Sequence, residues 1–497
     1  MESKNSAEKL PKIPPLHVVM ASPEIAPFAK TGGLGDVLAS LPIALEQLGL
    51  RVSLVMPAYR SVLQGGFSIE DTGIDFTVPI SNSREAGTLL KTKVGRDITL
   101  YLIRADQYYD RENFYGTHGE DYLDNAERFT FFARSILGVL KYDPPAILHA
   151  HDWQSALAIA FLKAQPHLYL ELSSVKTIFT VHNLGYQGLF NYLDWHLLNL
   201  DERFFTPQYL EFYGKINFLK GGLVFADRIT TVSPSYADEI KTAEQGFGLD
   251  GVFRERAKDL VGILNGADYE IWNPETDPFI CKTYGLQNLW GKKSCKSELQ
   301  RTFGLHDVPD IPLIGMVSRL TSQKGFDLLE RAMDAMLSRG TQLVLLGTGD
   351  KHYEEIFAEM PERYPGKVGV KIDFDDSLAH KIIASSDLLL MPSRYEPSGL
   401  TQLYALRYGT IPIVRATGGL RDTVREFDPK TGEGDGFIFN TYDVPEFLQA
   451  LDRALELLRQ KEKWAKLMRN AMTADFSWGR SARSYADLYQ QLAGSST

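Results

Sequence analysis

The sequence is short of cysteine, of long apolar runs and of positive charge. Its 497 residues include two cysteines, Cys281 and Cys295, which match neither a disulfide framework nor a zinc motif. No run of about 18 apolar residues occurs, so the sequence predicts no membrane span. The formal net charge of −10 argues against a nucleic-acid partner, which would need a basic face. A locally basic pocket for a small anion is still compatible with an acidic protein.

Residues 1–15 also lack the features of a targeting segment. They are polar and broken by prolines, without the apolar centre of a signal peptide or the arginines of a transit peptide. We therefore expect a short flexible leader on a cytoplasmic protein. Hydrophobic residues make up 44% of the chain, and the length allows two or three globular domains of roughly 150 residues each.

What the sequence does contain is a regular alternation of strand and helix signals. An apolar stretch at 16–21 predicts a buried strand, and a glycine-rich turn at 30–36 follows it. The spacing of apolar residues over 37–48 then predicts a helix that ends at Gly49. With a second strand at 52–56, this is a βαβ unit. Further strands are predicted at 98–103, 146–150, 176–181 and 228–232.

The alternation starts again after residue 310. The two series predict an α/β fold of two doubly wound, Rossmann-like domains that face each other across a cleft. We place the first domain at 16–264 and the second at 265–472. A helical segment at 473–497 is expected to pack back on the first domain. Strands of the second series are predicted at 311–317, 342–346, 368–372, 388–391, 411–414 and 436–439, with a helix at 327–338.

The glycine-rich turn is a candidate phosphate site. Lys30 stands before Gly32, Gly33 and Gly35, and Asp36 follows them. Glycines let backbone N–H groups approach a phosphate, and the start of a helix adds partial positive charge. The spacing matches neither G-x-G-x-x-G nor a Walker A motif, which disfavours a dehydrogenase or a kinase. The alternative interpretation is a tight turn with a solvated lysine.

Charged residues follow two predicted strands of the second domain. Arg319 and Lys324 come after the strand at 311–317, and two cations there suit a diphosphate. Glu396 comes after the strand at 388–391 and can accept hydrogen bonds from sugar hydroxyls or offset positive charge at an anomeric carbon. The alternatives are surface cations at a strand end and a structural helix cap.

Polar and aromatic residues follow two strands of the first domain. His182 and Asn183 end the strand at 176–181, and Asp152 and Trp153 end the strand before it. Because ligands bind beyond the carboxyl ends of parallel strands, we expect these residues at the same cleft. The polar groups suit sugar hydroxyls, and the indole suits the face of a pyranose ring.

Two patterns formally suggest a metal. The pair His149 and His151 has no third ligand nearby in the sequence, so a metal site is disfavoured. Asp373-Phe374-Asp375 matches the D-x-D pattern of some glycosyltransferases. We interpret it as a turn after the strand at 368–372, with Phe374 available to stack on a base.

In this order, the motifs closely resemble those of the bacterial glycogen synthases and plant starch synthases. The resemblance implies the two-Rossmann GT-B fold, with the first domain on the acceptor side and the second on the nucleotide-sugar side. It extends from His17 to about Tyr489. Its pieces are Lys30-Thr31-Gly32-Gly33-Leu34, His149-Ala150-His151-Asp152-Trp153, Val181-His182-Asn183-Leu184, Asn265-Gly266, Ser318-Arg319-Leu320, Gln323-Lys324-Gly325 and Thr417-Gly418-Gly419-Leu420.

The resemblance also implies roles for individual residues and no metal or other cofactor. Arg319 and Lys324 would neutralise the diphosphate, Glu396 would hold the glucose, His182 would line the glucose site, and Asp152 would meet the glucan or glucose. These five are the predicted catalytic residues. The implied donor site comprises Lys30, Gly33, Asp36, Asn265, Arg319, Lys324, Phe374, Glu396, Ser398, Gly399, Leu400 and Thr401, and the implied acceptor and glucose site comprises Asp152, Trp153, His182 and Asn183.

The implied activity is retaining transfer of glucose from ADP-glucose to the non-reducing end of an α-1,4-glucan, with release of ADP. The partners would be the glucan and the nucleotide sugar, and the sequence leaves a homo-oligomer open. UDP-glucose as donor, or a catalytically silent glucan-binding or priming homologue, are the alternatives. The chain departs from the family pattern at Ser398, where a cysteine is usual, and at Tyr404, the second position of the common E-x7-E motif.

Overall fold

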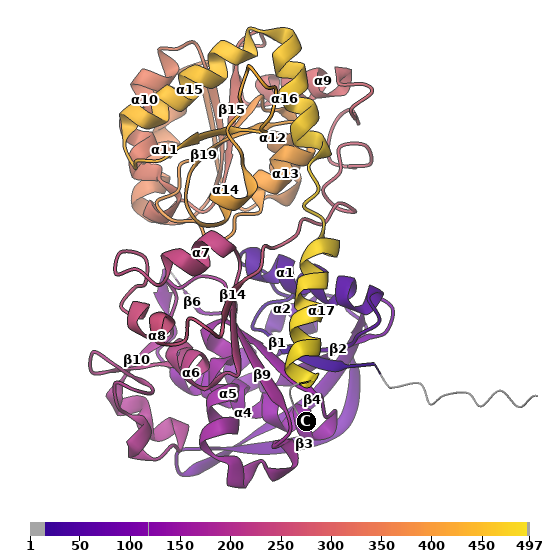
Figure 1. Ribbon diagram of the computed structural model, residues 1–497, viewed down its shortest axis with the longest axis vertical. Helices are drawn as coiled ribbons and strands as arrows, with labels where there is room; N and C mark the ends of the chain where they lie inside the picture. The colour runs from indigo at the N-terminus through magenta and orange to yellow at the C-terminus, as the bar shows by residue number, and fades with distance from the viewer. Residues whose placement is uncertain (1–14, 118, 495–497) are drawn as a thin grey trace, which may run out of the picture.

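The computed structural model describes residues 15–117 and 119–494. The predicted leader at 1–15 therefore lies outside the described residues except for Pro15. Within the described part of the chain, no helix is both long and apolar enough to span a membrane. The chain forms two α/β domains stacked one above the other (Figure 1).

A nine-stranded sheet forms the centre of the first domain. From β14 to β5 neighbouring strands run parallel, whereas β4 and β3 add an antiparallel hairpin at one edge. The central strands β1 and β8 are buried along their whole length, as expected where helices cover both faces of a parallel sheet. In spatial order the strands are β14 (Leu260–Gly262), β13 (Arg228–Thr231), β9 (Lys176–Val181), β8 (Ile147–His151), β1 (His17–Ala21), β2 (Arg51–Pro57), β5 (Ile98–Arg104), β4 (Ser83–Val94) and β3 (Glu70–Ile80).

The second domain has a six-stranded sheet in which all neighbours are parallel. Its strands are short and apolar, which suits burial on both faces. In spatial order they are β17 (Val368–Ile372), β16 (Gln342–Gly347), β15 (Leu313–Val317), β18 (Leu388–Met391), β19 (Ile411–Arg415) and β20 (Phe437–Phe439).

Amphipathic helices complete both domains. In the first domain α4, α5 and α6 pack together, and α1 packs on α17. The first-domain helices include α1 (Gly33–Gln47), α4 (Asn125–Tyr142), α5 (Asp152–Ala164), α6 (Phe218–Phe225), α7 (Pro234–Glu239) and α17 (Trp478–Gly494). The second-domain helices are α9 (Trp290–Thr302), α10 (Phe326–Leu337), α11 (Lys351–Arg363), α12 (Asp376–Ser385), α13 (Thr401–Arg407), α14 (Gly418–Thr423), α15 (Val444–Leu458) and α16 (Lys461–Thr473).

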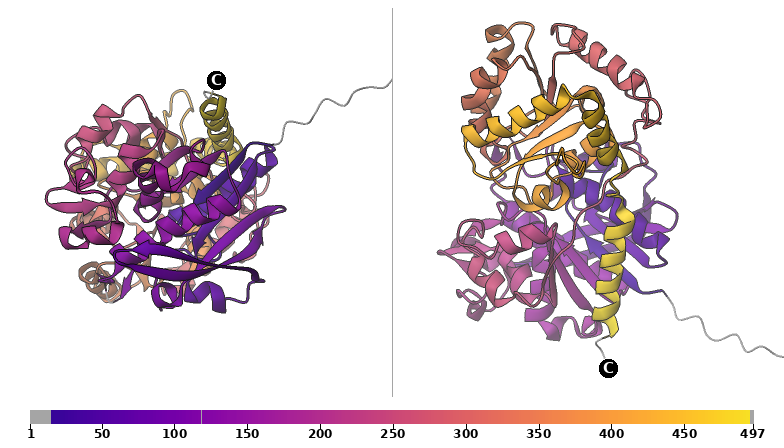
Figure 2. Two further views of the ribbon diagram at one scale, coloured as in Figure 1. Left: turned by 90° about the horizontal axis from the view of Figure 1, so that it is seen from below. Right: turned by 45° about the horizontal axis from the view of Figure 1, so that its top comes forward.

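The C-terminal helix returns to the first domain, as predicted. Figures 1 and 2 show α17 running down the side of the first domain beside α1. Its residues Trp478, Tyr485 and Tyr489 belong to the first domain's apolar core. The chain passes between the domains at two segments, one at Ala267 and one at Phe476. A hydrogen bond joins them, because the Ala267 amide donates to the Phe476 carbonyl at 2.7 Å.

Among the parallel strands of each sheet, the strand order reverses at one point. The reversal lies between β1 and β8 in the first sheet and between β15 and β18 in the second. Because ligands of doubly wound sheets bind at the carboxyl ends of the strands at such a point, the two sheets together mark a single place for the site. That place is between the domains.

Two local predictions need correction. The helix predicted from residue 37 begins at Gly33, so Gly33 and Asp36 lie in the first turn of α1 and not in a loop. The hairpin of β3 and β4 was not predicted at all. Both strands are partly exposed, and β3 forms the edge of the sheet, where Gly73 and Pro79 interrupt the alternation of apolar and polar residues that would have indicated it.

Candidate functional site

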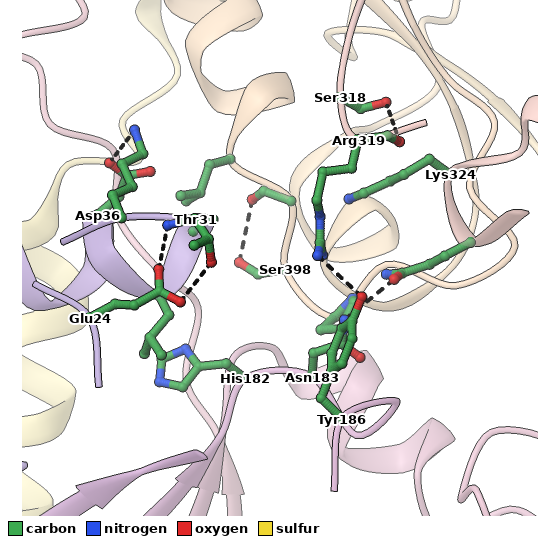
Figure 3. Close-up of a pocket in the computed structure, with 18 of the residues that line it drawn as sticks. Glu24, Thr31, Asp36, His182, Asn183, Tyr186, Ser318, Arg319, Lys324 and Ser398 are labelled. Atoms are coloured by element: carbon green, nitrogen blue, oxygen red, sulfur yellow. Dashed lines mark hydrogen bonds and ion pairs between the residues drawn. The ribbon is translucent and has the colours of Figure 1, made fainter. Parts of the chain in front are cut away.

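A cavity with a volume of about 690 Å³ lies between the two domains. Every residue predicted for the donor and acceptor sites lines it. Figure 3 shows Arg319 reaching from the second domain towards Tyr186 of the first, with Lys324 beside Arg319 and with Glu24, Thr31 and Asp36 on the opposite side. The structure therefore brings the predicted site residues together, while their individual roles stay predictions.

The two predicted phosphate cations follow β15 and already have partners. Arg319 donates from its guanidinium to the Tyr186 hydroxyl at 3.1 Å, a contact that crosses between the domains. Lys324 Nζ lies 2.5 Å from Glu396 Oε2. An incoming anion must therefore compete with a phenol for Arg319 and share Lys324 with a carboxylate.

Glu396 is a buried carboxylate with 4% of its surface exposed. Besides Lys324, the Ser393 hydroxyl donates to its Oε2 at 3.1 Å. The chain then runs through Ser398, Gly399 and Leu400 into α13, which begins at Thr401. Gly399 has φ +67°, a left-handed conformation that glycine adopts without strain. The contacts from Lys324 and Ser393 thus hold the Glu396 carboxylate, and Gly399 permits the turn beside it.

The glycine-rich segment after β1 is held by a buried acid that was not predicted. Glu24 accepts from the Thr31 amide at 2.6 Å and from the Thr31 hydroxyl at 2.7 Å. Lys30 Nζ lies 2.9 Å from Asp36 and 3.9 Å from Asp376 of the second domain. Burial raises the pKa of Asp36, and the Lys30 cation partly opposes that shift. Lys30 thus meets acids from both walls.

Asp152 has an unusual backbone for its residue type. Its φ is +56°, a region that non-glycine residues adopt rarely and at a cost. Its Oδ1 accepts the His182 amide at 2.7 Å, which joins the ends of β8 and β9. Burial raises the pKa of Asp152 to about 7, and the His182 N–H only partly offsets this. A carboxyl with a rare backbone conformation and a pKa raised to about 7 is a candidate for a functional group.

Three histidines near Asp152 are in contact with one another. His151 Nδ1 lies 3.0 Å from His182 Nε2, and His149 contacts the Tyr489 hydroxyl at 2.8 Å. Burial lowers the pKa of His149 and of His182 to about 3 and that of His151 well below its usual value. All three are therefore neutral at physiological pH. His149 is fully buried and belongs to the core.

The remaining predicted residues differ in how freely they face the cleft. The Asn265 side-chain oxygen is buried and has no hydrogen-bond donor among the described residues. Phe374 is 61% exposed at the end of β17. Trp153 packs instead against Phe129, with ring centroids 4.8 Å apart, and against Phe190. The indole therefore forms part of the cleft wall, and its stacking on a sugar ring stays a prediction.

No metal cluster is apparent at this site. Across 15–117 and 119–494, no group of three or more His, Cys, Asp or Glu side chains is placed to hold an ion. Asp375 of the D-x-D pattern instead caps α12, because it accepts the Leu378 amide at 2.9 Å. This use agrees with the predicted turn.

Comparison with known proteins gives the family. The starch synthase catalytic domain pattern matches residues 17–255, and the pattern named glycosyl transferases group 1 matches 305–471. The glycogen synthase of Syntrophotalea carbinolica is 45% identical over 96% of this chain and 99% of its own. That of Geobacillus stearothermophilus is 44% identical over 96% and 98%. The chain belongs to the glycogen and starch synthase family.

Solved structures agree with that assignment. The catalytic domain of starch synthase IV from Arabidopsis thaliana, bound to ADP and acarbose, superposes with a TM-score of 0.88 at 34% identity. The match covers 97% of this chain and all of that one. Sucrose-phosphate synthase from Thermosynechococcus elongatus shares the fold, with a TM-score of 0.60 at 18% identity. The protein is thus a GT-B glycosyltransferase of the glycogen and starch synthase type.

Several cleft residues of this glycosyltransferase were missed from sequence. Glu24 follows β1 directly, so the rule that site residues follow strands could have found it. Tyr186 is near His182 in the sequence and could have been included with it. Tyr115 donates to Glu24 at 2.7 Å from a distant loop, and no local signal indicates its position.

Proposed function

We propose that this glycosyltransferase uses ADP-glucose and transfers glucose, with retention, to the non-reducing end of an α-1,4-glucan, releasing ADP. One observation carries the proposal: Arg319, Lys324 and Glu396 converge with Lys30 in one cleft at the reversal points of two facing sheets. The ADP and acarbose bound to the Arabidopsis starch synthase support a nucleotide diphosphate and a glucan-like oligosaccharide as the ligands of the same fold.

In the proposed reaction the two cations act on the leaving group. As the bond between glucose and the diphosphate breaks, negative charge grows on the phosphate oxygens next to Arg319 and Lys324. Contacts that strengthen with this charge lower the barrier and not merely the dissociation constant. Glu396 holds glucose hydroxyls and offsets the positive charge that develops on the sugar.

We infer a front-face displacement. In this route the departing phosphate oxygen accepts the proton of the incoming glucan hydroxyl, while the new glycosidic bond forms on the face that the phosphate leaves. The protein's part is to neutralise charge and to hold both substrates in position. In this proposal the His182 backbone carbonyl helps to stabilise the charge on the sugar, and Asp152, which accepts the His182 amide, meets the glucan or the sugar.

We further propose that the reaction needs no metal and takes place in the cytoplasm. Lys30, Arg319 and Lys324 supply at the cleft the positive charge that a divalent ion supplies in other transferases. The expected result is that kcat is unchanged after dialysis against a chelator. A loss of activity that returns with added Mg²⁺ or Mn²⁺ would contradict this part of the proposal.

One assay tests the donor and the reaction together. The purified protein is mixed with glycogen and either ADP-glucose or UDP-glucose, and nucleotide release is followed by a coupled enzyme. We expect a higher kcat/KM with ADP-glucose and a new α-anomeric signal in the NMR spectrum of the product. A preference for UDP-glucose would overturn the donor. No release with either donor would indicate the silent glucan-binding homologue.

A further inference from the structure

Helix α7 of the first domain contacts the donor side of the cleft. Ser233, which caps α7, donates from its hydroxyl to the Pro397 carbonyl at 2.7 Å. This bond joins residues 164 positions apart, and Ser233 is fully buried. Pro397 is the residue directly after Glu396. A first-domain hydroxyl thus fixes the backbone of the loop that carries the predicted sugar-binding carboxylate.

Glu239, at the other end of α7, contacts the start of α14. Its Oε1 accepts the Gly418 amide at 2.8 Å, and its Oε2 accepts the Thr417 hydroxyl at 3.2 Å. Burial raises the pKa of Glu239, and the bonds from Gly418 and Thr417 work against that shift. In Figure 1, α7 and α14 face each other between the domains.

The start of α14 in turn rests on the loop at 396–398. The Gly419 amide donates to the Glu396 carbonyl at 3.0 Å. A Cβ atom added to Gly418 would lie 2.0 Å from the Glu396 carbonyl oxygen, and one added to Gly419 would lie 2.0 Å from that of Ser398. Only glycines permit this approach. Any shift at the Thr417-Gly418-Gly419 turn is therefore passed directly to Glu396.

We propose that Glu239 and Ser233 are positioning residues for the Glu396 loop, so that the first domain completes the donor-sugar site built on the second. The expected change in kcat rests on the proposed function, whereas the expected loss of support for the 396–398 loop does not. Glu239 holds Thr417 and Gly418, these hold the 396–398 backbone, and Ser233 holds the same backbone directly. The carboxylate of Glu396 takes its working position only when α7 is docked.

The same interface supplies a matched control. Ser235 of α7 donates to Asp422 of α14 from its amide at 2.8 Å and from its hydroxyl at 2.6 Å. Ser235→Ala removes one hydrogen bond across the same domain boundary and leaves the amide bond in place. No hydrogen bond joins Ser235 or the Asp422 side chain to the 396–398 loop in the described structure, so this variant tests the interface without the loop.

The experiment compares Glu239→Ala, Glu239→Gln and Ser235→Ala by kinetics and by hydrogen exchange. Glu239→Ala should lower kcat about tenfold, while the glucan KM and the Kd for ADP stay within about twofold, because the sugar and not the nucleotide loses its support. Backbone amides at 396–400 should exchange faster. Glu239→Gln keeps an acceptor for the Gly418 amide and should recover most of the activity, and Ser235→Ala should resemble the parent.

Two results would overturn the proposal. One is a Glu239→Ala protein with parental kcat and parental exchange at 396–400. The other is loss of ADP binding together with kcat, which would indicate failed domain closure and not a displaced sugar loop. If Glu239→Ala does not fold, Thr417→Val removes the hydroxyl contact with Glu239 and keeps the Gly418 amide bond, so it should show the same changes at a smaller size. A parent protein that transfers no glucose would overturn the proposed function, whereas the exchange readout would still decide the role of Glu239.

Discussion

The two walls of the cleft present different chemistry to the same space. On the first-domain wall, burial holds His151 and His182 neutral and raises the pKa of Asp152 to about 7. On the second-domain wall, Arg319 and Lys324 are charged, and each is kept in place by a polar partner. Around these histidines the first wall carries little charge, whereas the second wall is organised around its cations.

This difference fits the two proposed substrates. A glucan is uncharged, so a wall of neutral imidazoles and backbone groups can contact its hydroxyls without a large desolvation cost. A nucleotide diphosphate brings negative charge, which needs fixed cations. Elsewhere the first wall carries the ionisable side chains of Glu24, Lys30 and Asp36, and the 3.9 Å approach of Lys30 to Asp376 shows that this lysine faces the second domain. The comparison leads to four predictions, in order of decreasing effect.

The largest effect is expected from the cations of the second wall. Arg319→Ala and Lys324→Ala should each lower kcat by about a hundredfold, since one such electrostatic contact is worth on the order of 3 kcal/mol in a transition state. Arg319→Lys keeps the charge and loses the planar fork, so its kcat should fall between those of Arg319→Ala and the parent. Steady-state kinetics with thermal melts as a folding check measure this.

A matched control is available on the outer face of the second domain. Arg331 of α10 forms an exposed pair with Asp327 at 3.6 Å, and Arg331→Ala should leave kcat unchanged. Folded Arg319→Ala and Lys324→Ala proteins with near-normal kcat would remove the second wall's charge from the mechanism, and the contrast between the walls would lose its functional meaning.

The next effect concerns the acid on the same wall. Glu396→Gln keeps the shape of the side chain but removes its charge, and it leaves Lys324 without a carboxylate at 2.5 Å. If Glu396 offsets positive charge on the sugar, kcat should fall nearly as far in Glu396→Gln as in Glu396→Ala, by about a hundredfold. Ser393→Ala, which removes only the 3.1 Å hydrogen bond to this carboxylate, should cost about threefold.

The opposite outcome would also be informative. A Glu396→Gln protein that keeps most of the parental kcat would show that Glu396 only orients hydroxyl groups. The second wall would then contribute cations alone to the chemistry, and the comparison would become sharper.

A smaller effect is expected on the first wall, as a pH dependence of stability. The folded pKa of Asp152 is raised from 3.8 to about 7. Its protonated form therefore stabilises the fold below about pH 4, and this stabilisation is lost as the pH rises through 7. Asp152→Asn removes the change, so the Tm of the variant relative to the parent should increase by about 3 °C from pH 4.5 to pH 8.

The buried histidines act in the other direction and serve as a check. Their lowered pKa values mean that the fold loses stability as the pH falls below about 6.5 in both proteins. Because this loss is the same in Asp152→Asn and in the parent, it cancels in the difference between their Tm values. A constant Tm difference over the whole range would show that Asp152 titrates normally, and the first wall would then carry a charge after all.

How far the sequence could predict this arrangement differs between the walls. Arg319, Lys324 and Glu396 each follow a short apolar strand and carry charge, so the strand rule and the family resemblance both point to them. The neutrality of His182 and the raised pKa of Asp152 depend on burial among segments far apart in the chain, which no local pattern contains.

The same limit determined which parts of the fold could be predicted. Parallel strands such as β9 and β17 are compact apolar runs and were predicted with their bounds, whereas the half-exposed hairpin of β3 and β4 was not. Contacts that join the domains, such as that between Ser233 and Pro397, had no sequence signal either. They depend on how two finished domains meet, and hydrophobic periodicity describes only the inside of each one.

The smallest effect is expected at the outer rim of the second wall. Phe374 follows β17 and is 61% exposed, so its ring adds little to the core and is free to stack on a nucleotide base. A base stacks on an aromatic ring through its face, and alanine substitution at such sites typically weakens binding about tenfold. Phe374→Ala should therefore raise the KM for the nucleotide sugar by about that factor, with kcat and Tm unchanged, because the base is remote from the bond that breaks. Phe374→Tyr keeps the stacking face and should match the parent. If Phe374→Ala leaves KM unchanged, the base lies elsewhere in the cleft. If Phe374→Ala lowers kcat instead, Phe374 takes part in the chemistry. The second wall then has no division between a charged centre and an edge that only stacks on the base.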